Sequence, residues 1–339
     1  MNETFIRLSH GSGSGLQELL REIVLPALLP KNSEILEDAA IIERPAGRIA
    51  FTSDSFVVWP LEFRGGDIGK LSACGTINDL AMMGARPLFM SVSLILEEGL
   101  DKNLLARALT SLRVECEKSG VAIACGDTKV VDSGKADGMF ISTSGIGAVP
   151  DDRRLSAGNA RAGDAVLVSG PIGLHGIAIL SQRKGLRFAS EAISDCAALN
   201  GLVEALLSVV PRTRALRDAT RGGCAAVLHE IADASKVSIT LDEKAIPIPD
   251  VVRGACSFLG LDPLHVANEG RFVAIVPAQS AQDATLVGHL GLLLRRLLRA
   301  HLGPRGPAVE QRQRDTGQQG AGDRGAVGER TQRQGVEPQ

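Results

Sequence analysis

Short apolar runs of strand length alternate with longer segments of helical periodicity along the first 150 residues. Two of the longer segments predict helices, at 67–83 and 101–119, and each is followed by a glycine that can terminate it. Four apolar runs predict strands: RIAFTSDSFVV (48–58), MSVSLIL (90–96), VAIAC (121–125) and GMFISTSGIGAV (138–149). This alternation predicts an α/β (α+β) fold, in which helices pack against a sheet.

A second set of strands and helices follows the charged, glycine-containing segment 151–164. The predicted strands lie at 165–173, 237–243 and 271–277, and the predicted helices at 175–183, 199–210, 224–235 and 250–259. The sequence therefore predicts two α/β domains, one over residues 1–155 and one over 156–300. A leucine-rich run at 286–302 predicts one further amphipathic helix.

The last part of the chain differs in composition. From Gly303 to Gln339 the sequence contains no Leu, Ile, Met, Phe or Trp, and it is rich in Gly, Arg and Gln. Such a segment cannot bury enough apolar surface to offset its chain entropy. We expect residues 303–339 to be disordered.

Composition excludes several classes of protein. The net charge is −2, which argues against binding to nucleic acid or to an anionic membrane. Tyr is absent, and no apolar stretch is long enough to span a bilayer. The six cysteines are scattered, without the spacing of a zinc site, so we expect reduced thiols in a cytoplasmic protein without a targeting segment.

A glycine-rich segment, HGSGSG, precedes the helix-like stretch LQELLREIV near the N-terminus. Glycines before a helix let backbone N–H groups face a phosphate, which makes nucleotide-binding candidates of His10, Gly11, Ser12 and Gly13. The spacing is not that of a dinucleotide fingerprint, and a flexible N-terminal loop is an equally good interpretation. A second segment, RGGDIGKLS (64–72), lacks two required positions of a P-loop, which excludes a standard P-loop NTPase.

Four aspartates lie at or near the ends of predicted strands and turns: Asp38, Asp54, Asp79 and Asp127. One such aspartate is usually a turn or cap residue. Four of them, each flanked by small or apolar residues, predict carboxylates that converge on Mg²⁺, which prefers oxygen ligands and commonly bridges nucleotide phosphates. The charged residues Asp127 and Lys129 in CGDTKVV fit either this site or a solvated loop at the end of the strand.

Two segments of the second domain place polar residues beside the predicted end of an element. In RDATRGGCAAVLHEIA (217–232), the residues Asp218, Thr220 and Arg221 precede a helix, where an N-cap is the simpler interpretation. In ANEGRFVAIVP (267–277), Glu269 lies in a tight turn before an apolar strand, and a structural turn residue is the simpler interpretation. Neither segment identifies a site by itself.

Five segments, taken in order, closely resemble the HypE family of hydrogenase maturation proteins, the carbamoyl dehydratases: HGSGSG, TSDSFVVWPLEFRGGDIGKLSACGTINDLAMMGARP, CGDTKVV, DATRGG and NEGRF. The resemblance covers roughly residues 5–284, and the long block at 52–87 makes chance similarity implausible. It implies the two-domain fold of aminoimidazole ribonucleotide synthetase, selenophosphate synthetase and thiamine monophosphate kinase. It also implies a homodimer in which the first domain of each subunit holds ATP and Mg²⁺.

The resemblance further implies a reaction. In the family, the carbamoyltransferase HypF places a carbamoyl group on the thiol of a C-terminal cysteine. ATP then phosphorylates the carboxamide oxygen, and loss of phosphate leaves a protein thiocyanate. The thiocyanate supplies cyanide ligands for the iron of nickel–iron hydrogenase, and the HypC–HypD scaffold complex is a further implied partner.

Carried over residue by residue, the resemblance implies that Glu269 is the base and that Lys129 stabilises phosphate charge or joins the proton transfer. The implied Mg²⁺ ligands are Asp38, Asp54, Asp79 and Asp127, and the implied glycine-rich nucleotide segment runs from His10 to Gly15. The other implied site residues are Lys70, Asn78 and Thr128 for the nucleotide, with Asp218, Thr220 and Arg221 beside them.

This sequence departs from the family in two places. Where the family usually has a Gly-Gly pair, this chain has Gly13-Ser14, and we expect altered nucleotide affinity if the backbone needs positive φ there. The family ends in Pro-Arg-Ile-Cys, whose thiol carries the substrate, whereas this chain ends in GVEPQ and has Cys256 as its last cysteine. We hypothesise a reading-frame change near Thr285, which would leave the chain without its own carrier thiol, and residual activity stays an open question.

Two other functions are compatible with the sequence. One is a small-molecule kinase or synthetase of the same superfamily, and the other is a binding module that docks maturation partners without turnover. Selenophosphate synthetase needs Cys or selenocysteine in its glycine-rich segment, and no cysteine precedes Cys74 here. Phosphate release from ATP that depends on a carbamoylated peptide distinguishes the dehydratase from both alternatives.

Overall fold

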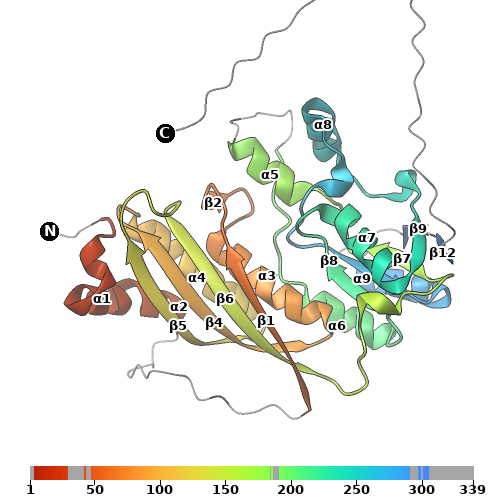
Figure 1. Ribbon diagram of the computed structural model, residues 1–339, viewed down its shortest axis with the longest axis horizontal. Helices are drawn as coiled ribbons and strands as arrows, with labels where there is room; N and C mark the ends of the chain where they lie inside the picture. The colour runs from red at the N-terminus through yellow and green to blue at the C-terminus, as the bar shows by residue number, and fades with distance from the viewer. Residues whose placement is uncertain are drawn as a thin grey trace, which may run out of the picture. The chain divides into compact units, whose positions relative to one another are not determined.

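The computed structural model describes residues 4–29, 42, 47–183, 185, 191–290, 297–298 and 301–304. Its first half is built on a four-stranded sheet with the strand order β1-β6-β4-β5 (Figure 1). The strands are β1 (Arg48–Phe56), β4 (Arg86–Glu97), β5 (Ala122–Val131) and β6 (Met139–Val149). β6 runs antiparallel to both β1 and β4, whereas β4 and β5 are parallel and are joined by a helical crossover.

Two helices, α3 (Ile68–Met82) and α4 (Lys102–Lys118), cover one face of this sheet (Figure 1). Each is preceded by an aspartate, Asp67 or Asp101, whose carboxylate accepts a backbone N–H bond at 2.9 or 2.7 Å. The predicted helices at 67–83 and 101–119 therefore agree with the observed helices in position and length.

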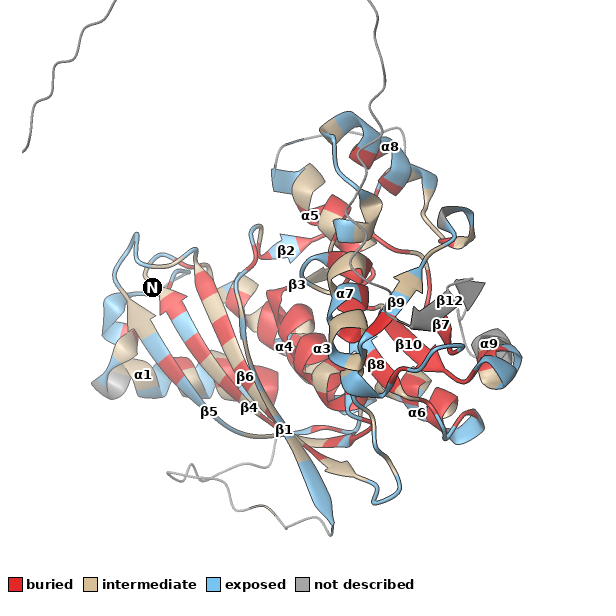
Figure 2. Cartoon of the chain, turned by 45° about the vertical axis from the view of Figure 1, so that its right-hand side comes forward, coloured by how far each residue is buried: buried red, intermediate tan, exposed pale blue. Residues whose placement is uncertain are grey.

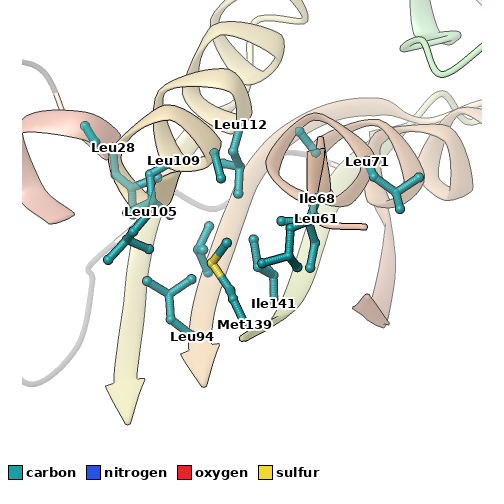
Figure 3. Packing of buried hydrophobic residues seen from close by; sticks show 14 of the residues in the cluster. Leu28, Leu61, Ile68, Leu71, Leu94, Leu105, Leu109, Leu112, Met139 and Ile141 are labelled. Atoms are coloured by element: carbon teal, nitrogen blue, oxygen red, sulfur yellow. The ribbon is translucent and has the colours of Figure 1, made fainter. Parts of the chain in front are cut away.

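The core between these helices and the sheet is aliphatic. α3 and α4 can approach closely because residue 69 is a glycine. A Cβ at this position would lie 1.7 Å from the carbonyl oxygen of Ala108. Figure 3 shows how leucines of α4 pack over strand residues in this core, and the residues concerned are Leu105, Leu109, Leu112, Leu94, Met139 and Ile141. Full burial of one such side chain contributes roughly 1.5–3 kcal/mol.

The second half is built on another sheet, with the strand order β11-β7-β10-β8. β10 runs antiparallel to both β7 and β8, and all five of its residues are buried (Figure 2). The strands are β7 (Ala165–Val168), β8 (Ala215–Asp218), β10 (Phe272–Val276) and β11 (Leu297–Leu298). A continuous apolar strand of this kind requires cover on both faces.

Helices provide that cover. Val273 and Ile275 of β10 join a core with α7, whereas alternate residues of β10 join a core with α6 and α9. Ala81 and Met82, at the end of α3, also belong to the core that contains α6 and α9. α3 therefore packs against both halves of the chain. The helices of the second half are α5 (Leu174–Arg183), α6 (Asn200–Val209), α7 (Gly223–Ser235), α8 (Asp250–Leu259) and α9 (Ala281–Leu290).

The remaining elements are short. Before the first sheet lie η1 (Leu8–Gly11), α1 (Gly13–Leu19), the π-helix η2 (Leu20–Val24) and α2 (Leu25–Leu28). Two small antiparallel pairs are formed by β2 (Glu62–Phe63) with β3 (Gly66–Asp67) and by β9 (Val237–Thr240) with β12 (His301–Pro304). Short helical turns are η3 (Ala157–Asn159), η4 (Glu243–Ala245), η5 (Pro263–His265) and η6 (Ala278–Ser280).

Most of the predicted helices and strands are confirmed, and three predictions are corrected. β5 continues to Val131, so Asp127 and Lys129 lie within a strand and not in a loop beyond it. β8 was missed because its four residues, ALRD, carry no clear alternation. The predicted helix at 286–302 is wrong in its extent: α9 ends at Leu290, and the following leucine-rich run contributes β11, which pairs with β7.

Two further expectations concern the ends of the second half. Gly303 and Pro304 belong to β12, whereas the rest of the segment predicted to be disordered lies outside the described residues. The boundary between the two domains, near residue 155, stays a proposal. Within the part of the chain that the structure describes, no helix is both long and apolar enough to cross a membrane.

Candidate active site

A cavity of about 630 Å³ lies where β1, α3, α5 and the turn before β10 meet. One side of its wall is acidic and is formed by Asp54, Asp79, Asp218 and Glu269. The remaining wall includes apolar side chains of α5 and of the segment after β1, together with Arg183. Polar groups that converge in a largely apolar hollow are typical of a site for a charged small molecule.

Strand alternation directs Asp54 toward α3. Its neighbours on the same side of β1 show this direction: Thr52 Oγ1 donates a hydrogen bond to Asp79 Oδ2 at 2.7 Å, and Phe56 lies against α3. The contact with Phe56 requires glycine at position 75, because a Cβ on Gly75 would lie 2.7 Å from the ring. Asp54 of the first strand and Asp79 of α3 therefore face the same space.

The crowding of carboxyl groups raises their pKa values. Burial, followed by the charge and hydrogen bond of Asp79, raises the pKa of Asp54 to about 6. Burial, followed by the charge of Asp79, raises the pKa of Asp218 to about 6. The pKa of Glu269 is raised to about 8 by burial and then by the charges of Asp218, Asp195 and Asp54. A cation bound in the cavity would relieve this repulsion.

The acidic wall offers the kind of oxygen ligands that a Mg²⁺ ion would take, but it does not provide a complete set by itself. Carboxylate oxygens are the ligands that Mg²⁺ prefers, and the repulsion between Asp54 and Asp79 is what a divalent ion offsets. Among the described residues, no group of three or more His, Cys, Asp or Glu side chains is arranged to hold an ion. Mg²⁺ commonly takes one or two carboxylates and fills its other positions with water and phosphate oxygens.

The turn that carries Glu269 is held by the surrounding backbone. Asn268, which is completely buried, accepts from the N–H of Gly173 at 2.7 Å and donates to the carbonyl of Ala219 at 2.8 Å. The carbonyl of Glu269 itself accepts from the amide of Asn78 and from a backbone N–H, both at 3.4 Å. The Glu269 side chain is thus presented to the cavity by a fixed backbone.

The segment between β8 and α7 contributes Thr220 and Arg221 to the wall. Gly222 and Gly223 follow with φ values of 74° and 63°, and a Cβ on Gly223 would lie 2.4 Å from the carbonyl oxygen of Leu264. No side chain caps α7, so the expected N-cap role of this segment is not observed. The charge of Arg221 lowers the pKa of both neighbouring acids, Asp54 and Glu269, against the dominant effect of burial.

A second group of the sequence-derived candidates lies on β5 and η1. A Cβ on Gly11 would lie 3.2 Å from the side chain of Val130, so the glycine-rich segment packs against this strand. Lys129 Nζ lies 3.1 Å from the carboxylate of Asp127, and this contact is the largest of the causes that lower the pKa of Asp127. Thr128, between them, is buried. Of these candidates, His10, Gly11, Ser12 and Gly13 lie in or next to η1, and Asp127, Thr128 and Lys129 lie on β5.

Asp127 and Lys129 lie on the opposite face of the first sheet from Asp54 and Asp79, whereas the buried Thr128, which pairs with Leu94, lies on the helix-covered face. Asp127 pairs with Ser93 across β5 and β4 and is exposed, whereas Asp54 faces α3. The strand order also places β1 and β5 at the two edges, three strand spacings or roughly 14 Å apart. Within one protomer, the structure therefore does not bring Asp127 together with Asp54 and Asp79.

The remaining candidates from the sequence are Asp38, Lys70 and Asn78. Asp38 lies outside the described residues. Lys70 is in the first turn of α3, where its Nζ donates to the carbonyl of Gly65 at 3.1 Å. Asn78 is buried, and its side chain bonds the backbone of the segment before α6 as well as Glu269. Asn78 thus supports the Glu269 turn from α3.

Sequence reasoning missed three residues at the cavity: His175, Arg183 and Asp195. His175 and Arg183 line the wall from α5, and the helical periodicity there predicted only a packed face. Asp195 lies behind the Glu269 turn in a segment without periodicity, where no local signal could have found it. None of the three belongs to a sequence motif, and tertiary folding alone brings each to the site or behind it.

Comparison with known proteins identifies the class first. Residues 36–149 match the N-terminal domain of the AIR synthase related proteins, and residues 161–287 match the C-terminal domain. Carbamoyl dehydratase HypE of Azotobacter vinelandii is 49% identical over 278 residues, which cover 82% of this chain and 82% of that protein. The chain therefore belongs to the HypE family of carbamoyl dehydratases, which are hydrogenase maturation proteins.

Solved structures agree with this membership. A crystal structure of hydrogenase maturation protein HypE in complex with ATP has a TM-score of 0.83 and 43% identity, covering 88% of this chain and 89% of that one. The structure of a HypE–HypF complex has a TM-score of 0.74 and 41% identity, covering 86% and 93%. The two-domain fold expected from the sequence is confirmed.

The buried His175 predicts a specific dependence of stability on pH. Burial, followed by the charge of Arg183, lowers the pKa of His175 to about 4. Between the ordinary value of 6.5 and that value, only the unfolded chain binds a proton at this residue, so the free energy of unfolding falls as pH falls. The slope from this residue is at most about 1.4 kcal/mol per pH unit.

His175→Gln should flatten this acid limb in urea unfolding measured from about pH 7 to about pH 4. The matched control is His265→Gln, because His265 is exposed in η5 and its replacement should leave the wild-type slope unchanged. A wild-type slope in the His175 variant would contradict the assignment.

Proposed function

We propose that this protein uses ATP to dehydrate a protein-bound thiocarbamate to a thiocyanate. The observation that carries the proposal is the position of Glu269, a carboxyl group with a pKa raised to about 8, in the acidic cavity of a HypE-family chain. In the overall reaction, R–S–C(=O)–NH₂ and ATP give R–S–C≡N, ADP and phosphate. The oxygen removed from the carboxamide leaves in the phosphate.

The first step transfers a phosphoryl group. The carboxamide oxygen attacks the γ-phosphorus, ADP leaves, and the nitrogen loses one of its two protons to solvent. Catalysis of this step consists mainly of positioning and charge stabilisation. Arg221 and the N-terminus of α7, which no side chain caps, supply positive charge beside the acidic wall. The proposed Mg²⁺ ligands in this cavity are Asp54 and Asp79, and the ion, when bound, would neutralise charge on the triphosphate. Asp127 lies on the opposite face of the sheet within the same protomer, and Asp38 lies outside the described residues.

The second step forms the nitrile. The C–O bond to the phosphate breaks while a base removes the remaining N–H proton, so a proton acceptor must face the substrate. Glu269 is suited to this role because an ionised carboxylate of raised pKa is a stronger base than an ordinary one. Its neighbours Asp54 and Asp218 repel the negative charge, which favours the uptake of the proton.

Glu269→Gln should retain ATP binding and lower the rate of nitrile formation by at least about 100-fold. The substitution keeps the size of the side chain but removes its basicity. ATP binding is measured by calorimetry, and the nitrile by mass spectrometry of a peptide that ends in an S-carbamoylated Pro-Arg-Ile-Cys. Glu230→Gln, on the exposed side of α7, is the control and should match the wild type. A normal thiocyanate yield from Glu269→Gln would remove this residue from the mechanism.

The nucleotide is held in part by the group on β5 and η1. Lys129 is exposed and positively charged, and it lies on β5, the strand against which the glycine-rich segment packs. Asp127, beside it, is the proposed ligand of a cation that accompanies the phosphates. Asp127→Asn should raise the dissociation constant for ATP at least about tenfold and change the free energy of unfolding by less than about 0.5 kcal/mol. Asp132→Asn, exposed just beyond the same strand, is the control. Unchanged ATP affinity in Asp127→Asn would exclude it from the site.

A homodimer through the first sheet fits the surface of that sheet. The face opposite α3 and α4 carries no helix among the described residues, as Figure 1 shows. Its centre consists of serines from three neighbouring strands, which pair across β1, β6 and β4: Ser53, Ser55, Ser142, Ser144, Ser91 and Ser93. Phe51, 68% exposed, and Ile49, 57% exposed, extend this face at one end. Small side chains let a second sheet approach, and an exposed apolar patch marks an interaction surface.

Phe51→Glu should therefore convert a dimer into a folded monomer, because it places a charge in the apolar part of this face. Analytical ultracentrifugation measures the mass, and circular dichroism checks the fold. Phe258→Glu is the matched control, since Phe258 is 73% exposed on α8 and lies away from the sheet. An undiminished dimer in Phe51→Glu would show that another surface is used.

The proposed partners follow the chemistry. The carbamoyl group comes from HypF, which is supported by the similarity to a HypE chain crystallised with HypF. The product passes to the HypC–HypD complex. In this sequence the last cysteine is Cys256, which is 1% exposed in α8, so the test supplies the thiocarbamate on a separate peptide.

Phosphate release from ATP tests the function as a whole. Release that requires the carbamoylated peptide supports the dehydratase. Release that requires a small metabolite instead would favour a kinase or synthetase, and binding of HypF without any turnover would favour a scaffold.

A further inference from the structure

Asp195 is a buried charged residue that the proposed chemistry does not use. It lies in the segment between α5 and α6, and its side chain is completely buried. Oδ1 accepts the N–H of His175 at 3.1 Å and the N–H of Glu269 at 3.4 Å. Burial of a carboxylate lowers the stability of the fold unless the carboxylate is paired and hydrogen bonded. The position of Asp195 directly behind the Glu269 turn therefore indicates a role.

The partner of this carboxylate lies on the other side of the same turn. Arg271 Nε is 3.7 Å from Asp195 Oδ2, and the guanidinium donates to the carbonyls of Pro171 and Gly270. Oδ2 itself has no hydrogen-bond partner among the described residues. A Cβ on Gly270 would lie 1.9 Å from the backbone oxygen of Asp195, so the turn and the segment are in direct contact.

We propose that Asp195, held by Arg271, is a positioning residue that fixes the backbone of Glu269 so that the Glu269 carboxyl meets the substrate. The assignment rests on the proposed dehydration. The Asp195 carboxylate bonds the amide of Glu269, while the segment next to it bonds the carbonyl through Ala197 N–H at 3.4 Å. Both polar groups of the Glu269 backbone are therefore engaged from behind. The charge of Asp195 also helps to raise the pKa of Glu269.

A second buried ion pair in the same half of the chain provides a matched control. Asp164 Oδ2 accepts from Arg214 Nε at 2.8 Å, and the Asp164 side chain is 5% exposed. These two residues precede β7 and β8, whereas Glu269 lies beside the end of β8, because β10 runs antiparallel to both strands. Asp164 thus lies at the opposite end of the sheet from the cavity, and its loss should affect stability alone.

The experiment compares Asp195→Asn with Asp164→Asn in the full chain. With the carbamoylated peptide and ATP, Asp195→Asn should lower kcat by about 10-fold to 100-fold and leave KM for both substrates within about twofold, because a misplaced base slows the chemical step and not binding. Asp164→Asn should retain the wild-type kcat and KM. A wild-type kcat in Asp195→Asn, or equal losses in both variants, would overturn the proposal.

Asp195→Asn leaves Arg271 without its counter-charge, and the protein can be destabilised for that reason alone. The double variant Asp195→Asn with Arg271→Gln removes both charges and should fold while it shows the same loss of kcat. Wild-type kcat in that double variant would overturn the proposal.

Hydrogen exchange of the Glu269 amide separates this proposal from the proposed function. An amide hydrogen bond to a neutral acceptor is weaker than one to a carboxylate, so exchange should be about tenfold faster in Asp195→Asn and unchanged in Asp164→Asn. If the wild type shows no dehydration, the function fails, yet this measurement still decides whether Asp195 fixes the turn. Unaltered exchange in Asp195→Asn would show that it does not.

Discussion

The burial of β10 fixes the geometry on which the cavity depends. All five residues of this strand are buried between helices on both faces, and its antiparallel pairing with β8 places Phe272 opposite Asp218. Asp218 and the turn that carries Glu269 are consequently brought to the same end of the sheet. α3 contributes to both hydrophobic cores, so Asp79 and the adjacent Asp54 reach the same place. Four acids are thus gathered by apolar packing and not by attraction between them.

This arrangement has an energetic consequence. Carboxyl groups that share a partly buried space raise one another's pKa, which disfavours the ionised folded state. Proteins accept such local destabilisation at functional sites when a ligand offsets it. In the proposed function, a magnesium nucleotide would carry cationic charge to the acids and anionic phosphates to Arg221 and the start of α7. Burial, together with this repulsion, raises the pKa of Glu269 and makes it a strong proton acceptor once it is ionised.

Much of the fold could be predicted from the sequence, because the strands of the first sheet are marked by apolar runs and helices such as α4 and α8 carry clear periodicity. α3 is buried on nearly all sides and is marked instead by Asp67 before it and Gly84 after it. Asp54 and Asp79 could be singled out because each lies at or near the end of a predicted strand or turn. Asp218 and Glu269 could be singled out only through the resemblance to the HypE family, because their segments alone indicate a cap and a turn. The face of the sheet on which Asp127 lies could not be predicted. The apolar run ends at Cys125, and a residue beyond it has a defined face only if the strand continues, as β5 does. Asp195 could not be found at all, since its importance depends on a tertiary contact with a turn 74 residues away.

The most direct test of the account is a time course with the wild-type chain, ATP and a peptide whose terminal S-carbamoyl carbon is labelled with carbon-13. The account predicts that the carbonyl resonance is replaced by a nitrile resonance and that one phosphate is released for each nitrile formed. Phosphate release while the carbonyl resonance persists would contradict it, because ATP would then be consumed without dehydration of the thiocarbamate.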